Sequence, residues 1–130
     1  MTTALASGTF DLIHPGHLDY LRQAKKHGDR LIVLVARDET VMHIKGKRPL
    51  NNERTRLERI SHLEIVHTAF LGSMTDHYTF LDEKPDVVCL GYDQHDFTGQ
   101  LEGEIRKRGL KTKIVRLKPF KPEKWKSSKV

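Results

Sequence analysis

Cysteine is almost absent from this sequence, since Cys89 is the only one among 130 residues. A single thiol forms no internal disulfide and no thiolate metal cluster, which excludes small disulfide-bonded scaffolds and zinc ribbons. Long apolar runs are also missing: the longest, 31–36 and 87–90, are far shorter than the roughly 20 residues of a membrane helix. The first residues show no basic stretch followed by a long apolar one, so we expect no secretory signal, no membrane partner and a cytoplasmic protein.

Acidic side chains are scarce in only one part of the chain. Residues 106–130 hold 11 of the 23 lysines and arginines but a single acid, Glu123. The net charge of +6 is therefore a property of the C-terminal segment. A basic segment with few aromatic residues is typical either of loose nucleic-acid binding or of the phosphate-binding wall of a pocket for a small polyanion, and composition leaves both open.

Apolar strand-like segments alternate with helical ones along the chain. Runs rich in β-branched residues predict strands at 3–6, 30–36, 65–71, 86–90 and 113–117. Helical spacing of apolar residues predicts helices at 16–27, 52–62, 78–83 and 101–108. We therefore predict one α/β domain over residues 1–130, a Rossmann-like doubly wound parallel sheet of about five strands with flanking helices. Ligands bind beyond the carboxyl ends of such strands, which points to the loops 7–17, 37–50, 91–98 and 118–128.

The first of these loops ends in two histidines around a proline and a glycine, His14-Pro15-Gly16-His17, at the predicted start of a helix. Free backbone N–H groups and the helix dipole favour an anion there, and Gly16 lets the backbone approach a phosphate. Both imidazoles can stabilise charge that develops during phosphoryl or nucleotidyl transfer. A zinc site is the alternative, although the intervening Pro15 and Gly16 suit a phosphate-binding turn better.

Four segments together resemble one protein family. The segment 7–38, which contains GTFDLIHPGH, resembles the opening of the HxGH nucleotidyltransferase superfamily in its cytidylyltransferase-like branch. Residues 44–56 (IKGKRPLNNERTR) resemble the family's basic loop and the helix after it. Residues 90–94 (LGYDQ) resemble its nucleotide-recognition loop, and 124–130 (KWKSSKV) resemble the beginning of its terminal signature. Members join a nucleoside triphosphate to a phosphorylated small molecule and release pyrophosphate.

Within the superfamily, residues 35–41, 84–94 and 114–120 look most like archaeal FAD synthases. This resemblance implies transfer of AMP from ATP to FMN, with Mg²⁺ or another divalent cation held mainly by phosphate oxygens and water, close to Asp11. It also implies a homodimer. Cytidylyl transfer to glycerol 3-phosphate and adenylyl transfer to a sugar phosphate are the alternative reactions. A noncatalytic nucleotide- or nucleic-acid-binding module is the alternative outside catalysis, although nucleic acid is not the expected partner.

The resemblance also implies roles for single residues. His14, His17 and Lys25 would be catalytic and neutralise charge on the phosphates. Segment 118–130 would close on the site. The alternative is that Lys25 and Arg56 are ordinary solvent-exposed helix residues with no role in the site. The residues expected to bind the nucleotide are Thr9, Phe10, His14, Pro15, Gly16, His17, Arg56, Asp93, Ser127 and Ser128.

Overall fold

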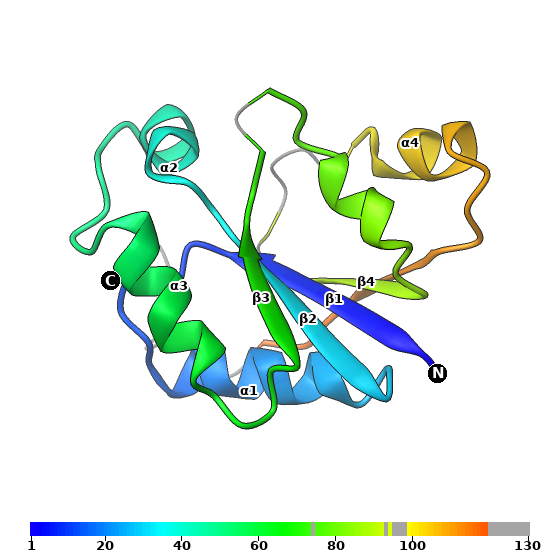
Figure 1. The fold of residues 1–130 in the computed structure, drawn as a ribbon, viewed down its shortest axis with the longest axis horizontal. Coiled ribbons are helices and arrows are strands. Elements are labelled where there is room, and N and C mark those ends of the chain that lie inside the picture. The colour runs from blue at the N-terminus through cyan, green and yellow to red at the C-terminus, as the bar shows by residue number, and fades with distance from the viewer. Residues whose placement is uncertain (74, 93, 95–98, 120–130) are drawn as a thin grey trace.

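A single all-parallel sheet organises the protein, whose computed structural model describes residues 1–73, 75–92, 94 and 99–119. Its strand order is β3-β2-β1-β4-β5 (Figure 1). The predicted Rossmann-like fold is confirmed. The strands are β1 (Thr3–Gly8), β2 (Arg30–Val35), β3 (Thr68–Leu71), β4 (Val87–Leu90) and β5 (Lys113–Arg116).

The helical segments match the sequence pattern with one exception. Residues 37–50 were expected as a loop, but they contain a helix of eight residues. Its start has no side-chain cap at Arg37, so the usual N-terminal signal is missing from the sequence. Gly46 ends it in the left-handed conformation, at φ 74°. The helical elements are α1 (Pro15–Lys25), α2 (Asp38–Lys45), α3 (Glu53–Ser61), the 3₁₀ helix η1 (Thr79–Glu83) and α4 (Leu101–Lys107).

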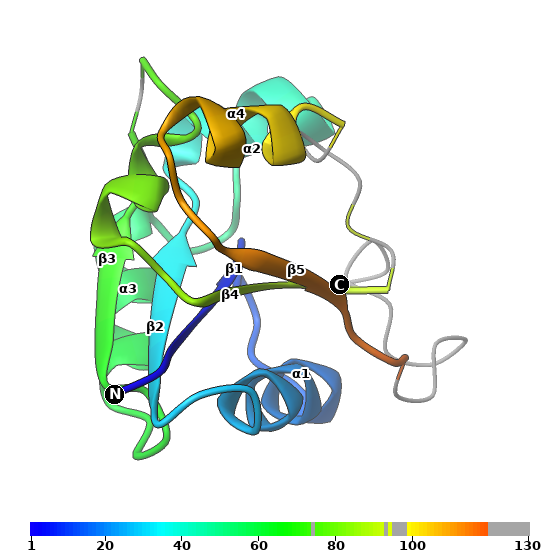
Figure 2. The same ribbon diagram turned by 90° about the vertical axis from the view of Figure 1, so that its right-hand side faces the viewer.

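The two faces of the sheet are covered unequally. The helices α1 and α3 pack on one face, where Leu21 and Ile60 are fully buried. The other face is covered by η1 and α4, through Leu81 and Leu101, and these elements have only five and seven residues (Figure 2). A short cover leaves part of an apolar sheet face without a packing partner. The carboxyl end of this second face is therefore open to a ligand.

The strand order reverses between β1 and β4, so the carboxyl ends of these two strands form the switch point at which parallel α/β sheets bind ligands. The Tyr20 hydroxyl joins them, because it donates to the Ser7 carbonyl at 2.9 Å and contacts the Cys89 carbonyl at 3.3 Å. The Gln94 amide also crosses to β1 and donates to Ser7 Oγ at 2.8 Å. In the described ranges, no helix is long and apolar enough to span a membrane.

Candidate active site

The histidine motif forms the first turn of α1. His14 is the N-cap, and its Nδ1 accepts hydrogen bonds from the backbone N–H groups of Gly16 (3.1 Å) and His17 (3.4 Å). Pro15 follows at the first helical position, where a missing N–H costs nothing. Because Nδ1 accepts these bonds, the neutral ring of His14 carries its proton on Nε2.

The two imidazole rings stack on each other, with centroids 3.9 Å apart and an interplanar angle of 16°. Burial lowers the pKa of His14. Burial also lowers the pKa of His17 to about 4, and the nearby charges of His14 and Lys45 act in the same direction against a backbone hydrogen bond to Leu12. Both rings are therefore mostly neutral at pH 7, and a neutral imidazole carries a single N–H, which in His14 is the Nε2–H.

The loop that leads into the motif turns sharply at Phe10, which has a positive φ of 55°. The Phe10 ring is buried and meets His17 edge-on, with centroids 5.5 Å apart. It also fills the space beside Gly8, where an added Cβ would lie 2.9 Å from the ring. A small residue at position 8 is thus required by the aromatic ring that supports His17.

A cavity of about 640 Å³ opens beside the motif and extends over the open part of the sheet. Five of the residues expected to bind the nucleotide line it: Thr9, Phe10, His14, Gly16 and His17. The basic residues Lys45, Lys47 and Arg48 line it as well. Imidazole N–H groups, a helix N-terminus and three basic side chains therefore face one space, which suits a polyphosphate.

Lys25 does not lie in this cavity. It is the last residue of the eleven-residue helix α1, whereas His14 caps the start, so a rise of 1.5 Å per residue separates them by roughly 15 Å. Its ammonium group lies 3.5 Å from the Gly28 carbonyl. The helix carries Lys25 away from the histidines, and its catalytic role stays a prediction.

Lys45 and Lys47 stand in its place, and the sequence prediction missed them as site residues. The charge of Lys45 is close enough to His17 to lower its pKa. Both lysines come from the basic KGKRP segment that was expected only as a loop. The available signal was its place in the stretch 37–50 after β2, because ligands bind beyond the carboxyl ends of the strands in such a sheet.

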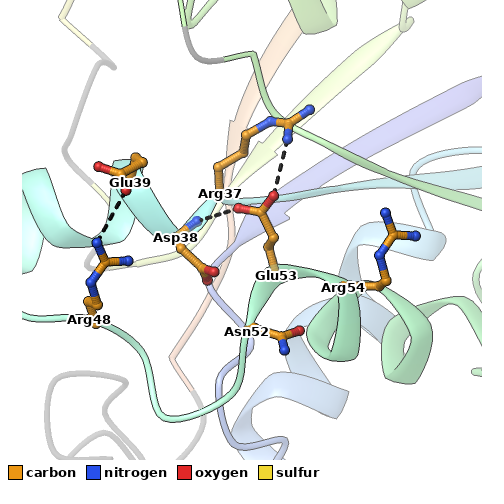
Figure 3. A pocket seen from close by; sticks show the side chains of 7 residues that line it. All are labelled: Arg37, Asp38, Glu39, Arg48, Asn52, Glu53 and Arg54. Carbon is orange, nitrogen blue, oxygen red and sulfur yellow. Dashed lines mark hydrogen bonds and ion pairs between the residues drawn. The ribbon is translucent and has the colours of Figure 1, made fainter.

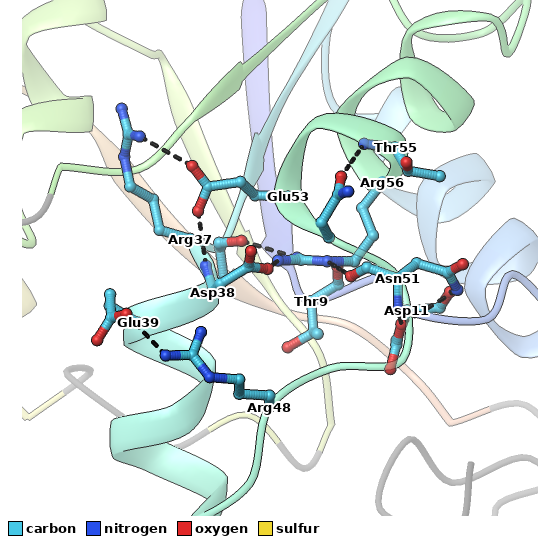
Figure 4. Close-up of polar contacts among 12 residues, drawn as sticks. Thr9, Asp11, Arg37, Asp38, Glu39, Arg48, Asn51, Glu53, Thr55 and Arg56 are labelled. Carbon is cyan, nitrogen blue, oxygen red and sulfur yellow. Dashed lines mark hydrogen bonds and ion pairs between the residues drawn. The ribbon is translucent and has the colours of Figure 1, made fainter.

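Arg56 lies inside the protein, with no exposed surface, and it does not line the cavity. Figure 4 shows its side chain among its polar contacts. Its Nη1 donates to the carbonyls of Thr9 (2.9 Å) and Ala36 (2.7 Å). Its Nε donates to the Asn51 carbonyl (2.9 Å), and Nη2 pairs with Asp38 (2.7 Å). With these donors engaged, Arg56 joins the loops after β1 and β2 to the start of α3, and its expected phosphate contact stays a prediction.

Asp11 anchors the residues that directly follow the basic KGKRP segment, 45–49. Its carboxylate accepts hydrogen bonds from the backbone N–H groups of Leu50 (2.7 Å) and Asn51 (2.8 Å), as Figure 4 shows for Asn51. Burial would raise the pKa of Asp11, but these bonds and the charge of Arg56 together lower it. Within the described parts of the chain, no three His, Cys, Asp or Glu side chains group to hold a metal. Asp11 therefore anchors the loop in this geometry.

Three expected nucleotide-binding residues, Asp93, Ser127 and Ser128, lie outside the described residues. The chain can be followed into the basic C-terminal segment as far as residue 119. Lys118 lines the cavity, and its backbone is held by Gln23 of α1 through two hydrogen bonds of 2.9 Å. Lys118, the first residue of segment 118–130, is thus fixed beside the cavity.

A second, shallower hollow of about 580 Å³ lies where α2 and α3 begin (Figure 3). Its charged side chains pair with each other: Arg37 with Glu53 at 3.1 Å, and Arg48 with Glu39 at 3.4 Å. Glu53 also accepts the backbone N–H of Asp38 at 2.9 Å. The two contacts of Glu53 join α3 to the start of α2.

Comparison with known proteins agrees with this arrangement. The cytidylyltransferase-like family model matches residues 5–130. The FAD synthase of Methanohalophilus mahii is 49% identical over 118 residues, which cover 90% of this chain and 82% of that protein. The FAD synthase of Aciduliprofundum boonei is 47% identical over 121 residues, which cover 92% of this chain and 80% of that protein.

Solved structures show the same fold. A lipopolysaccharide core biosynthesis protein from Thermoplasma volcanium is 43% identical, with a TM-score of 0.86 over 92% of this chain and 98% of that one. The pantoate-beta-alanine ligase of Francisella tularensis is 16% identical, with a TM-score of 0.59 over 89% of this chain and 58% of that one, and shows the fold alone. By its histidine motif, its parallel sheet and the family match over residues 5–130, the chain belongs to the cytidylyltransferase-like family.

Proposed function

We propose that this protein is a nucleotidyltransferase that transfers AMP from ATP to FMN, giving FAD and pyrophosphate. The observation that carries the proposal is the neutral, stacked pair His14 and His17 at the start of α1, facing a cavity lined by Lys45 and Lys47. The choice of acceptor is supported by relatives named FAD synthase, which are 46–49% identical over at least 90% of this chain.

In the proposed reaction, a phosphate oxygen of FMN attacks the α-phosphorus of ATP in line with the leaving group. A new P–O bond forms at the α-phosphorus, the bond to the β-phosphate oxygen breaks, and pyrophosphate leaves. The nucleophile arrives ionised, so no base and no covalent enzyme intermediate is required. The protein then has to position the phosphates and stabilise the charge that builds up on them.

The residues divide this work by their chemistry. The imidazoles of His14 and His17 are held in fixed positions by the N-cap bonds and by their stacking, so their contacts to the phosphates would favour the transition state without reorganisation. Lys45 and Lys47, which line the same cavity, would supply positive charge to the phosphates. Mg²⁺ or another divalent cation would enter with ATP, held by phosphate oxygens and water, and would neutralise charge on the leaving pyrophosphate.

The remaining expectations belong to the same proposal. Asp93 would contact the nucleotide's sugar or base, and Ser127 and Ser128 would donate to the β- and γ-phosphates. Replacing both serines by alanine is expected to raise the KM for ATP more than it lowers kcat, as measured by steady-state kinetics. An unchanged KM for ATP would remove the serines from the nucleotide site.

We also propose that the protein is a homodimer and that it is located in the cytoplasm. Its support, besides the resemblance, is the exposure of large apolar side chains near the cavity mouth, with Leu50 78% and Leu12 40% exposed. Light scattering on the purified protein measures the assembly directly, and a mass of 15.0 kDa at micromolar concentration would contradict a dimer.

The experiment that tests the reaction offers the protein ATP or CTP, labelled at the α-phosphate, with Mg²⁺ and a set of acceptors. The acceptors are FMN, glycerol 3-phosphate and a sugar phosphate, the last of which the lipopolysaccharide-related neighbour also motivates. The expected product is labelled FAD from ATP and FMN. Labelled product from another combination of nucleotide and acceptor would show that the proposed substrates are wrong. Salt-sensitive nucleic-acid binding with no turnover would favour the binding-module alternative.

A further inference from the structure

The cavity has an apolar part that the phosphates do not need. Near their carboxyl ends, three neighbouring strands supply residues that line it: the apolar Leu34 of β2 and Leu90 of β4, with Ser7 of β1 between them. Ser7 and Leu34 are paired in register, so these side chains form one row across the carboxyl end of the sheet. The short elements η1 and α4 cover the preceding row, which includes Leu5 and Val88, more completely than this one.

Apolar side chains from the helices on both sides of the sheet end line this part of the cavity. Val41 and Ile44 of α2 line one side of the cavity. Phe80 of η1 and Leu101 of α4 line the other, and Figure 1 shows α2 and α4 on opposite sides of this end of the sheet. Ile44 is 37% exposed although it is a large apolar residue, so its side chain lacks a full packing partner in the described part of the protein. A flat apolar group fits between such walls.

We infer that this apolar part of the cavity binds the aromatic ring system of the phosphorylated acceptor and that Ile44 is a specificity-determining residue for it. The inference rests on the proposed function, because it takes the acceptor's phosphate to lie beside the histidines. A polar acceptor such as glycerol phosphate has no group that gains from these walls. An aromatic ring removes their apolar surface from water, so the site selects acceptors by ring as well as by phosphate.

The chain itself links ring and phosphate recognition. Ile44 lies in the apolar part of the wall, and the next residue, Lys45, is close enough to His17 to act on its pKa. Both belong to the last turn of α2. A ligand that contacts Ile44 with its ring therefore has a positive charge within reach of its phosphate end.

The test compares Ile44→Gln with Met42→Gln. Met42 lies on the same helix and is similarly exposed, at 41%, but it does not line the cavity. Binding of FMN is measured by the quenching of its fluorescence in the presence of α,β-methylene-ATP and Mg²⁺, which prevents turnover. FAD formation by each protein is measured separately. We expect Ile44→Gln to weaken FMN binding about tenfold and to raise the KM for FMN similarly, with the KM for ATP within about twofold. Met42→Gln should match the wild type.

The outcomes separate the two proposals. Equal FMN affinity in Ile44→Gln and wild type overturns the inference, as does a wild-type protein that binds no FMN. FMN binding that is weakened by Ile44→Gln but not by Met42→Gln, in a protein that makes no FAD, supports the ring site and contradicts the proposed reaction. A thermal unfolding scan of both variants checks that they are folded. If Ile44→Gln is not, Ile44→Val is the second variant, with a smaller loss of FMN affinity in the same direction.

Discussion

The two loops that meet at the cavity are held in different ways. The turn around His14 is held by its own backbone, since its N-cap, Pro15 and Gly16 lie within three residues of each other. The basic segment after α2 is held by side chains far away in the sequence: Asp11 binds its end, and Arg56 joins that end to the loops after β1 and β2. The first loop is therefore a local structure, whereas the second exists only in the folded protein.

The largest effect is expected from removing the link between the loops. Arg56→Ala leaves the Asp38 carboxylate without its ion pair and leaves the Thr9, Ala36 and Asn51 carbonyls without their donor. Losing one partner of a buried pair costs about 3–5 kcal/mol in the free energy of unfolding. Urea unfolding of the wild type and of Arg56→Ala measures this loss.

The matched control for this prediction is Arg59→Ala, because Arg59 is an exposed residue of the same helix. It should change the free energy of unfolding by less than about 0.5 kcal/mol. Equal losses in the two variants would contradict the special role of Arg56.

The next effect concerns the local loop. His17→Ala is expected to lower kcat for FAD formation by roughly 10² to 10³, because a fixed donor to the transition state is lost. ATP affinity should change less. His27→Ala, an exposed histidine beyond the other end of α1, is the control and should keep full activity. Near wild-type turnover in His17→Ala would remove His17 from the mechanism.

A smaller effect is expected from loosening the anchor of the basic segment. Asp11→Asn keeps the shape of the side chain but turns one of its two acceptor oxygens into a donor facing a backbone N–H. A mismatch of this kind costs about 1–3 kcal/mol, so kcat/KM for ATP should fall about tenfold or more. Asp29→Asn is the control, because Asp29 accepts from the backbone of Thr2 at an exposed position. Similar kinetics in both variants would contradict the anchoring role.

The smallest effect is on stability at low pH. The pKa of His17 is lowered to about 4 in the folded protein, from an ordinary value of 6.5. Between these values the unfolded chain binds a proton that the folded protein does not, so the stability of the ligand-free protein falls as the pH decreases from 6.5 to 4. Urea unfolding at pH 7 and pH 5 should show a smaller decline in His17→Gln than in wild type. Equal declines would contradict the lowered pKa.

The difference between the loops also explains what the sequence could predict. The strands and α1 were predictable because their signals are local: β-branched runs, apolar spacing, and a proline at the helix start. The histidine turn was predictable for the same reason. The contacts of Arg56 were not, because the carbonyls of Thr9 and Ala36 come together with it only once β1 and β2 are paired.

Lys25 and Lys45 also show that closeness in the sequence does not predict closeness in the folded protein. Lys25 follows the histidines closely in the sequence, but a helix of eleven residues carries it to the far end. Lys45 is far from the histidines in the sequence, and the missed helix α2 brings it beside His17. Helix length and loop anchoring, rather than sequence distance, decide which lysine lies near the histidines.

The central claim is that the basic segment that begins at Lys45, the last residue of α2, and not the end of α1, supplies the positive charge of the site. The most direct test measures the rate of FAD formation from ATP and FMN by Lys45→Ala and Lys25→Ala under identical conditions. The structure predicts that kcat/KM for ATP falls about tenfold or more in Lys45→Ala, which loses a charge beside the phosphates, and stays within about twofold in Lys25→Ala. Loss of activity in Lys25→Ala with a fully active Lys45→Ala would contradict it.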